Sequence, residues 1–276
     1  MRAPGEGHGW YLYGIAPRNG GGEAEIAGQP GLDGSAPVRA IPLDHLVAIA
    51  SPVSLAELGP AAIRARAGDL DWIETMVRGH ASVVEAVHRQ RGILPAKFGT
   101  VFPSADALLA ALERDETRLR AQLDRLAGCD EWGIRLCIDP SPLRTRLESA
   151  DPSLQELEHE LVTSGPGKSY LLRRRREDLL AAALERALSE LATRCFARLA
   201  RHAAAQVQTV QSRRNAPGTD GEVELLRAAF LVKRDHVPAF RATAARLPRG
   251  EQGLRCACSG PWPPYSFAEP ATEEPR

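Results

Sequence analysis

The feature that most constrains the fold is a helical pattern of unusual length, from about residue 168 to about residue 205. Apolar residues recur along it at steps of three and four, and five leucines form the stripe: Leu180, Leu184, Leu188, Leu191 and Leu199. At 1.5 Å per residue, a helix of about 38 residues extends roughly 57 Å, which exceeds the width of a small domain. We therefore expect part of it to protrude or to pack against another long helix, with the stripe as a candidate interaction surface. A shorter helix broken near Arg201 is the alternative.

Short apolar segments on both sides of this pattern indicate the fold class of the second half. Four of them have the alternation or apolar run typical of strands, and one has a helical pattern. In chain order they are a strand at 132–138, then strands at 206–211 and 223–233, a helix at 238–247 and a strand at 253–259. With the long helix after the first strand, the order β, α, β, β, α, β predicts a ferredoxin-like domain over residues 129–260.

The first half predicts a mixed α/β domain over residues 1–128. A strand begins at Trp10, and a second apolar run covers residues 45–49. An amphipathic helix follows from Leu70 to a glycine at position 92, and a further helix begins at Ser104. The chain as a whole is therefore expected to be an α/β (α+β) protein of two domains, followed by a proline- and aromatic-rich tail at 261–276.

Composition excludes several classes of protein. Lys and Arg together number 35 and Asp and Glu together number 35, so the formal net charge is zero, and only 5% of residues are aromatic. A nucleic-acid-binding protein is expected to have a basic surface and stacking aromatic residues. No apolar stretch approaches the ~20 residues needed to cross a bilayer. Five cysteines are too few for a disulfide scaffold. We expect a cytoplasmic protein that binds neither nucleic acid nor membrane.

Two charged or glycine-rich segments first suggest anion binding. Residues 164–169 read SGPGKS, but a phosphate-binding P-loop requires a glycine where Val162 stands and a strand in front of it. A glycine-containing linker that precedes the long helix accounts for these residues, and no bound nucleotide is needed to explain them. The four arginines at 173–176 could bind an anionic partner, but a run this short in a neutral protein favours a solvated helix face.

Histidine and cysteine positions do not form a catalytic or metal-binding pattern. Cys256 and Cys258 have CxC spacing, and no second Cys or His pair stands nearby. His80 lies within the apolar stripe of its helix, which favours a core histidine with one satisfied ring nitrogen. The sequence therefore predicts a non-enzyme without cofactor or metal.

Two segments go beyond these general patterns. Residues 93–102 read ILPAKFGTVF and resemble the signature VLPxRFGTxF of the gas vesicle GvpL/GvpF family, and residues 260–267 read GPWPPYSF and resemble the C-terminal ending of that family. Other landmarks resemble the family in the same order: Tyr11–Gly14, His80, Glu131–Gly133, Gly167–Leu171 and Ala228–Val232. The matching signature residues are Pro95, Lys97, Phe98, Gly99, Thr100, Gly260, Pro261, Trp262, Pro263, Pro264 and Tyr265. Lys97 departs from the family, which often has arginine there.

The resemblance implies a non-catalytic gas vesicle protein, either a minor structural component or an assembly factor. Its expected location is the gas vesicle in the cytoplasm. The implied partners are the gas vesicle shell protein and other gas vesicle accessory proteins, and a second copy of the chain is a further candidate. The alternative is a small-molecule-binding or enzymatic protein that uses the ferredoxin-like domain, because a fold does not determine a function.

The signature residues are expected to be mainly structural. Leu94, Phe98 and Phe102 are predicted as core anchors, while Lys97 faces the other way and neutralises a buried carboxylate. In the tail, three prolines favour an extended course. Two interpretations of the tail remain: a strap across the two domains of the protein itself, or a docking segment for a gas vesicle partner.

Overall fold

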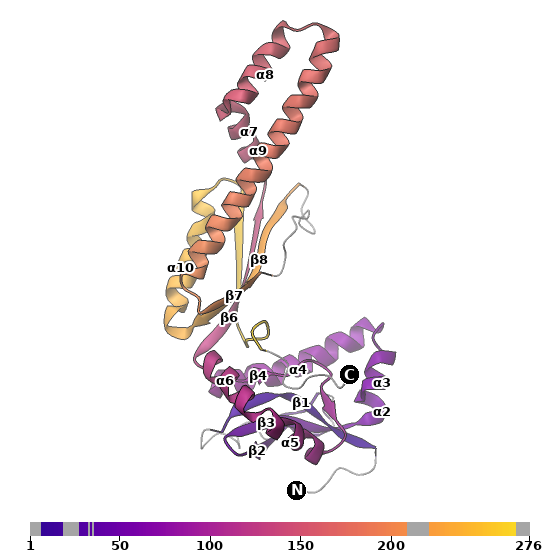
Figure 1. The fold of residues 1–276 in the computed structure, drawn as a ribbon. Coiled ribbons are helices and arrows are strands. Elements are labelled where there is room, and N and C mark those ends of the chain that lie inside the picture. Colours follow the sequence, from indigo (N-terminus) through magenta and orange to yellow (C-terminus); the bar gives the residue numbers. More distant parts are fainter. Residues whose placement is uncertain (1–6, 19–27, 33, 35, 209–220, 269–276) are drawn as a thin grey trace. The chain divides into compact units, whose positions relative to one another are not determined.

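A computed structural model describes residues 7–18, 28–32, 34, 36–208 and 221–268 (Figure 1). The chain divides into two compact units. Unit 1 comprises Met1–Glu131 together with Pro261–Arg276, and unit 2 comprises Trp132–Gly260. The described tail residues therefore pack with the N-terminal part of the chain.

Unit 1 is built on an antiparallel sheet. Its strands are β1 (His8–Pro17), β2 (Arg39–Leu43), β3 (Leu46–Ser54), β4 (Leu94–Pro95) and β5 (Val101–Phe102). Their order is β2-β3-β1-β4, and β5 also pairs with β1. The strand expected at 45–49 continues to Ser54, and β2 is a strand that the sequence pattern does not predict. Pro42 interrupts the apolar pattern of β2, and a proline is tolerated there because β2 is an edge strand.

Helices lie over both faces of this sheet (Figure 1). They are α2 (Leu55–Leu58), α3 (Pro60–Ala65), α4 (Leu70–Arg91), α5 (Ala105–Arg114) and α6 (Glu116–Leu126). Helix α4 begins where the Asp69 carboxylate accepts from Trp72 N–H at 3.1 Å. It ends at Gly92, whose φ of +78° favours glycine. The helix expected from Ser104 is in fact two helices, because the chain turns at Asp115.

Unit 2 has the ferredoxin-like order of elements. They are β6 (Cys129–Ile138), α7 (Ser141–Ala150), α8 (Pro152–Thr163), α9 (Pro166–Ala200), β7 (Ala205–Gln208), β8 (Val223–Lys233), α10 (Val237–Arg246) and β9 (Leu254–Trp262). The sheet order is β7-β8-β6-β9, and β7 pairs with β8 antiparallel. The mixed α/β fold class is thereby confirmed. Residues 209–211 of the strand expected at 206–211 lie outside the described residues.

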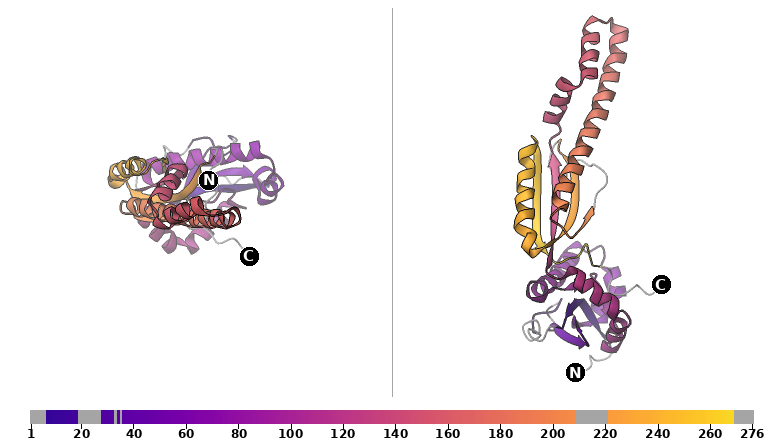
Figure 2. Two further views of the ribbon diagram at one scale, coloured as in Figure 1. Left: turned by 90° about the horizontal axis from the view of Figure 1, so that it is seen from above. Right: turned by 60° about the vertical axis from the view of Figure 1, so that its left-hand side comes forward.

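The long helix is α9, with 35 residues. At 1.5 Å per residue it spans about 52 Å. It ends at Ala200 with Arg201 as its cap, so the expected extension to residue 205 is wrong and the break near Arg201 is confirmed. Helices α7 and α8 lie along its N-terminal part, which extends beyond the sheet as a helical hairpin (Figures 1 and 2).

The leucine stripe of α9 faces inward, which corrects its prediction as an interaction surface. Leu188, Leu191 and Leu199 belong to the core of unit 2, and Leu184 packs against that core. Leu180 is buried as well. The physical reason is the apolar face of β6 and β8, which contributes Trp132, Leu136 and Phe230 among others to the same core. A stripe that covers a sheet of its own unit is not available to a partner.

Candidate functional site

A cavity of about 420 Å³ lies within unit 1. Helix α4 contributes Val77, His80, Ala81 and Glu85 to its lining. The remaining lining residues are 95–98, Glu131, Trp262, Tyr265 and Ala268. Both segments that carry the family resemblance thus meet at one place, although more than 150 residues separate them in the chain. They meet because the described tail folds back onto unit 1.

A buried hydrogen-bond chain includes His80, one of the residues that line this cavity. The hydroxyl group of Tyr11 lies 2.9 Å from His80 Nδ1, and Gly99 N–H donates to the same hydroxyl oxygen at 3.1 Å. The Tyr11 hydroxyl oxygen already accepts a hydrogen bond from Gly99. Its proton is therefore best donated to His80 Nδ1, because the buried hydroxyl donor would otherwise be unpaired. This assignment places the proton of the imidazole on Nε2. Tyr11, Tyr13 and Phe98 also contact the His80 ring as an aromatic cluster.

His80 is a neutral donor. Burial lowers its pKa to about 4, and the Ala96 backbone opposes this shift. Its Nε2 is buried and makes no hydrogen bond of acceptable geometry within the described ranges. The prediction of a core histidine with one satisfied nitrogen is therefore confirmed. Nε2 lies against the Ala96 backbone, so both ring nitrogens are enclosed by the protein itself.

The tail is held on unit 1 by a buried carboxylate. Glu131 is 8% exposed, and its two oxygens accept from Ser266 N–H and from the Ser266 hydroxyl group, each at 2.7 Å. Burial raises the pKa of Glu131, and the two hydrogen bonds from Ser266 oppose that increase. Arg125 donates to the Phe267 carbonyl oxygen at 2.8 Å, and the Phe267 side chain is buried. These contacts fix the described tail against unit 1.

The first signature segment forms a tight turn at the cavity. The Thr100 hydroxyl group donates to the Lys97 carbonyl oxygen at 2.7 Å, and Gly99 has a φ of +83°. Leu94 is fully buried and Phe98 is partly buried against the core of unit 1, as expected of core anchors, whereas Phe102 is partly buried and is not among the residues of that core. The reason is that Phe102 lies beside this short, exposed turn.

Lys97 does not neutralise a buried carboxylate in the described structure. It is exposed and lines the same cavity as Glu131, but the two form no ion pair within the described ranges. Ser266 holds Glu131 instead. In the second signature segment, Pro263 and Pro264 are buried, whereas Trp262 and Tyr265 remain 42% and 39% exposed at the cavity.

A second exposed apolar surface lies on the helical hairpin of unit 2. Val162 is 81% exposed near the end of α8, and Tyr170 and Leu171 are 65% and 66% exposed near the start of α9. We call these three residues the hairpin patch. The segment at 164–169 that resembles a P-loop comprises the two-residue connection at 164–165 and the first turn of α9, and it is preceded by helix rather than strand. Of the four-arginine run, Arg176 pairs with Glu148 and Glu158, whereas the other three are exposed.

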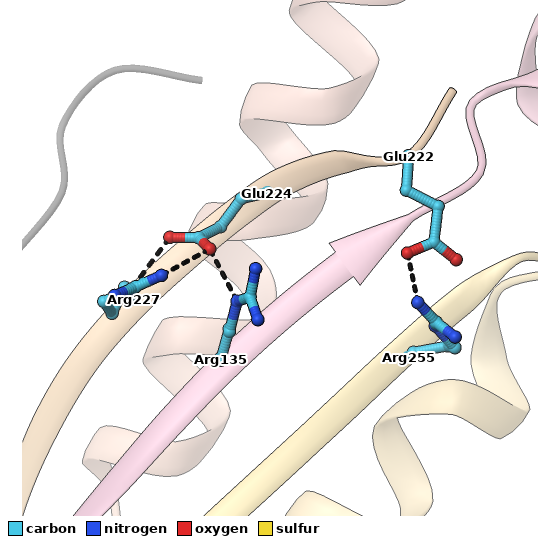
Figure 3. Close-up of polar contacts among 5 residues, drawn as sticks. All are labelled: Arg135, Glu222, Glu224, Arg227 and Arg255. Carbon is cyan, nitrogen blue, oxygen red and sulfur yellow. Dashed lines mark hydrogen bonds and ion pairs between the residues drawn. The ribbon is translucent and has the colours of Figure 1, made fainter. Parts of the chain in front are cut away.

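A polar cluster on unit 2 has a structural role (Figure 3). Glu224 on β8 accepts from Arg227 at 2.8 and 2.9 Å and from Arg135 on β6 at 2.6 Å, and Glu222 pairs with Arg255. The hydrogen bonds from Arg227 and Arg135 lower the pKa of Glu224. Such opposite charges across neighbouring strands stabilise their pairing.

The two cysteines of β9 differ in their surroundings. Cys256 is half-buried against the unit 2 core, and Cys258 is exposed. Burial raises the pKa of the Cys256 thiol to about 12. Among the described residues, no group of three or more His, Cys, Asp or Glu side chains could hold a metal ion. None of the described helices is long and apolar enough to span a membrane.

Several cavity residues could not be assigned from the sequence. Val77 and Ala81 are ordinary helix residues, and nothing in their spacing distinguishes a cavity wall from a core or solvent position. Glu131 was noted only as part of a family landmark, and its pairing with Ser266 has no local signal. The tyrosine-rich strand β1 was a usable signal, since a buried tyrosine hydroxyl requires a polar partner.

The comparisons with known proteins agree over most of the chain. Residues 9–269 match the family described as "Gas vesicle synthesis protein GvpL/GvpF". Gas vesicle protein L of Streptomyces sp. is 30% identical over 256 residues, which cover 87% of this chain and 86% of that protein. Gas vesicle protein L2 of Halobacterium salinarum is 30% identical over 224 residues, which cover 76% of this chain and 77% of that protein.

Solved structures agree on the fold. The crystal structure of the gas vesicle protein GvpF from Anabaena sp. PCC7120 has a TM-score of 0.71 at 22% identity and covers 95% of this chain and 98% of that chain. The GvpF structure from Microcystis aeruginosa has a TM-score of 0.61 at 20% identity, with 95% and 99% covered.

Proposed function

Because the chain belongs to the gas vesicle GvpL/GvpF family, we propose that it is a non-catalytic assembly factor or minor structural component of gas vesicles. A role related to gas vesicles follows from the family itself. The proposal adds that the protein contacts the shell protein and other gas vesicle accessory proteins during vesicle formation.

The hairpin patch is the observation that supports these contacts. Val162, Tyr170 and Leu171 are large apolar side chains, each more than half exposed, where α8 gives way to α9. Large apolar side chains exposed close together in the chain are a feature of surfaces that bind another protein. Tyrosine and arginine are enriched among the residues that dominate binding energy, and the exposed arginines 173–175 follow the patch directly. The expected shell protein is very apolar, so such a surface suits it.

The patch takes the place of the leucine stripe as the proposed contact surface of α9. The stripe is used inside unit 2, whereas Tyr170 and Leu171 of the patch lie on the part of α9 that extends beyond the sheet (Figure 1). The alternative function, a ligand-binding or catalytic ferredoxin-like domain, rests on fold alone. No contact described for unit 2 favours it over the contact role.

Deletion of the gene in a strain that forms gas vesicles tests the proposal. Electron microscopy should show vesicles lost on deletion and restored when the intact gene is returned. Normal vesicles in the deletion strain would contradict a required role.

A double variant, Tyr170→Ser with Leu171→Ser, locates the contact. It should fold with an unchanged Tm, because both side chains are solvated, but it should co-purify less shell protein than the wild type. Leu70→Ser is the matched control, since Leu70 is 76% exposed but lies on α4 of unit 1. Equal recovery of shell protein by both variants would reject the hairpin patch as the contact surface.

A further inference from the structure

We propose that the face of the unit 2 sheet that bears Arg135, Arg227 and Arg255 binds an acidic segment of a partner polypeptide through the carboxylates of that segment. We call these three residues the arginine face. The inference uses neither the hairpin patch nor the cavity of unit 1. Its failure would leave the proposed function unaffected, because that proposal rests on the family and on the hairpin patch.

The arginine face lies on the side of the sheet away from the core of unit 2 (Figure 3). Side chains alternate between the two faces of a strand. On β6 the residues at 132, 134, 136 and 138 belong to the core, so Arg135 points to the opposite face. The residues on either side of Arg227 in β8 and of Arg255 in β9 also pack in that core, so these two arginines share the face of Arg135.

The arginines of this face are exposed, whereas the carboxylates that hold them are nearly buried. The side chains of Arg135, Arg227 and Arg255 are 37%, 48% and 62% exposed. Glu224 accepts from the first two and is 6% exposed, and Glu222 pairs with the third and is 15% exposed. A partner that approaches the arginine face therefore meets three guanidinium groups before it meets a carboxylate.

Each guanidinium group keeps donors for a ligand. An arginine side chain has five N–H donors. Within the described ranges, Arg135 donates to Glu224 through Nε alone, and Arg227 donates to it through Nε and Nη2. Arg255 donates to Glu222 through Nη2. The two carboxylates thus hold the guanidinium groups in place, which reduces the side-chain entropy lost when a ligand binds to the remaining donors.

The spacing across the sheet suits several carboxylates of one chain. Arg227 and Arg255 lie on strands that are separated by β6. Neighbouring strands are about 4.8 Å apart, so the backbones of β8 and β9 are about 10 Å apart. Alternate side chains of an extended polypeptide point to the same side and are about 7 Å apart. An acidic segment therefore offers carboxylates at intervals that flexible arginine side chains can match, whereas one small anion contacts only part of the face.

The charges of the face disfavour two other occupants. A second copy of the chain would bring its own exposed arginines against these, and like charges across an interface are unfavourable. A nucleic acid has a more densely charged backbone than an acidic polypeptide, so Glu222 and Glu224 beneath the arginines repel it more strongly. Forked guanidinium donors also match a carboxylate with two hydrogen bonds. These arguments favour an acidic polypeptide.

Titration with an acidic peptide tests the inference. The probe is a fluorescently labelled synthetic peptide of Glu-Ser repeats, and a peptide of Gln-Ser repeats has the same length without the charge. Fluorescence anisotropy with the full-length protein at low ionic strength gives the Kd. The variant is Arg135→Gln with Arg255→Gln. Its matched control is Arg173→Gln with Arg174→Gln, which removes the same charge from exposed positions on α9.

The wild type and the α9 control should bind the Glu-Ser peptide with the same Kd, and neither should bind the Gln-Ser peptide. The affinity should fall about tenfold in the variant that lacks Arg135 and Arg255, because two charge-assisted contacts are lost. Lysine at both positions should retain part of the affinity, since it keeps the charge but lacks the forked donors. An equal loss in the α9 control, an unchanged Kd in the glutamine variant, or no binding by the wild type would overturn the inference.

Two further measurements guard against misfolding and against a different ligand class. Arg135→Gln alone leaves Glu224 paired with Arg227, so it replaces the double variant if that one fails to fold, and its affinity should fall about threefold. Inorganic phosphate and a single-stranded DNA oligonucleotide are tested on the same variants. Displacement of the peptide by phosphate at equal charge, or tighter binding of the oligonucleotide to the arginine face, would overturn the assignment to an acidic polypeptide.

Discussion

Replacement of Leu188 by alanine tests whether the leucine stripe of α9 is core or contact surface. Leu188 is 4% exposed and belongs to the core that α9 forms with the sheet of unit 2. The variant removes most of a buried side chain and leaves a void, since the rigid sheet on the other side cannot fully close around it. A contact surface would instead tolerate the change in the isolated protein.

The expected loss is large for one residue. Leucine-to-alanine changes in protein cores lower the free energy of unfolding by about 2–5 kcal/mol. For a unit of this size, each kcal/mol lowers Tm by roughly 3–5 °C. A central loss of about 3 kcal/mol therefore lowers the Tm of unit 2 by roughly 9–15 °C.

Differential scanning calorimetry of the purified full-length chain measures this change. Leu171→Ala is the matched control on the same helix, because Leu171 is 66% exposed, and its effect on stability should stay within about 0.5 kcal/mol. A Leu188→Ala variant with an unchanged Tm but weaker binding to the shell protein would refute the assignment of the stripe to the core.

Three further predictions concern single residues. Gly14→Ala should lower the free energy of unfolding in urea by about 1–3 kcal/mol, because the added Cβ would lie 2.6 Å from a backbone carbonyl oxygen. Gly167→Ala, where a Cβ meets open space, should not lower it, and equal stability of both variants would contradict the close strand packing. Glu224 has a lowered pKa in the folded state, so its stabilising contribution is present above its ordinary value of 4.5 and is lost as the pH falls below it. Unfolding between about pH 6 and pH 3 should thus show a steeper loss of stability in the wild type than in Glu224→Gln, and identical profiles would exclude this linkage. Ser266→Ala should accelerate limited proteolysis of the tail, because the Glu131 carboxylate loses one of its two donors; unchanged protection would argue against this clamp.

Local patterns accounted for much of the secondary structure. Strand alternation at 132–138 and the helical periodicity up to Gly92 are properties of neighbouring residues, and both elements are present in the structure. Strand and helix boundaries were predicted wrongly where the hydrophobic pattern was interrupted or fitted more than one structure. Pro42 concealed an edge strand, and a single leucine periodicity across Asp115 concealed the turn between two helices.

The residues that together line the cavity of unit 1 could not be predicted from local sequence patterns. His80, Lys97 and Trp262 each stand out in the sequence, but their common cavity depends on α4, the turn at residues 97–100 and the returning tail lying together. Periodicity describes which residues share a face of one element. It contains no information on which distant segment covers that face.

The sequence by itself determined the family, the ferredoxin-like order of elements in unit 2 and the presence of one very long helix. Only the tertiary structure decided that the leucine stripe is buried and that Tyr170 and Leu171 of the hairpin patch are exposed, although all of these residues lie on α9. The physical reason is that helical periodicity is local, whereas burial depends on a sheet assembled from β6 and β8, which lie about ninety residues apart in the chain. The same long-range assembly brings Ser266 to Glu131 and forms the rim of the cavity.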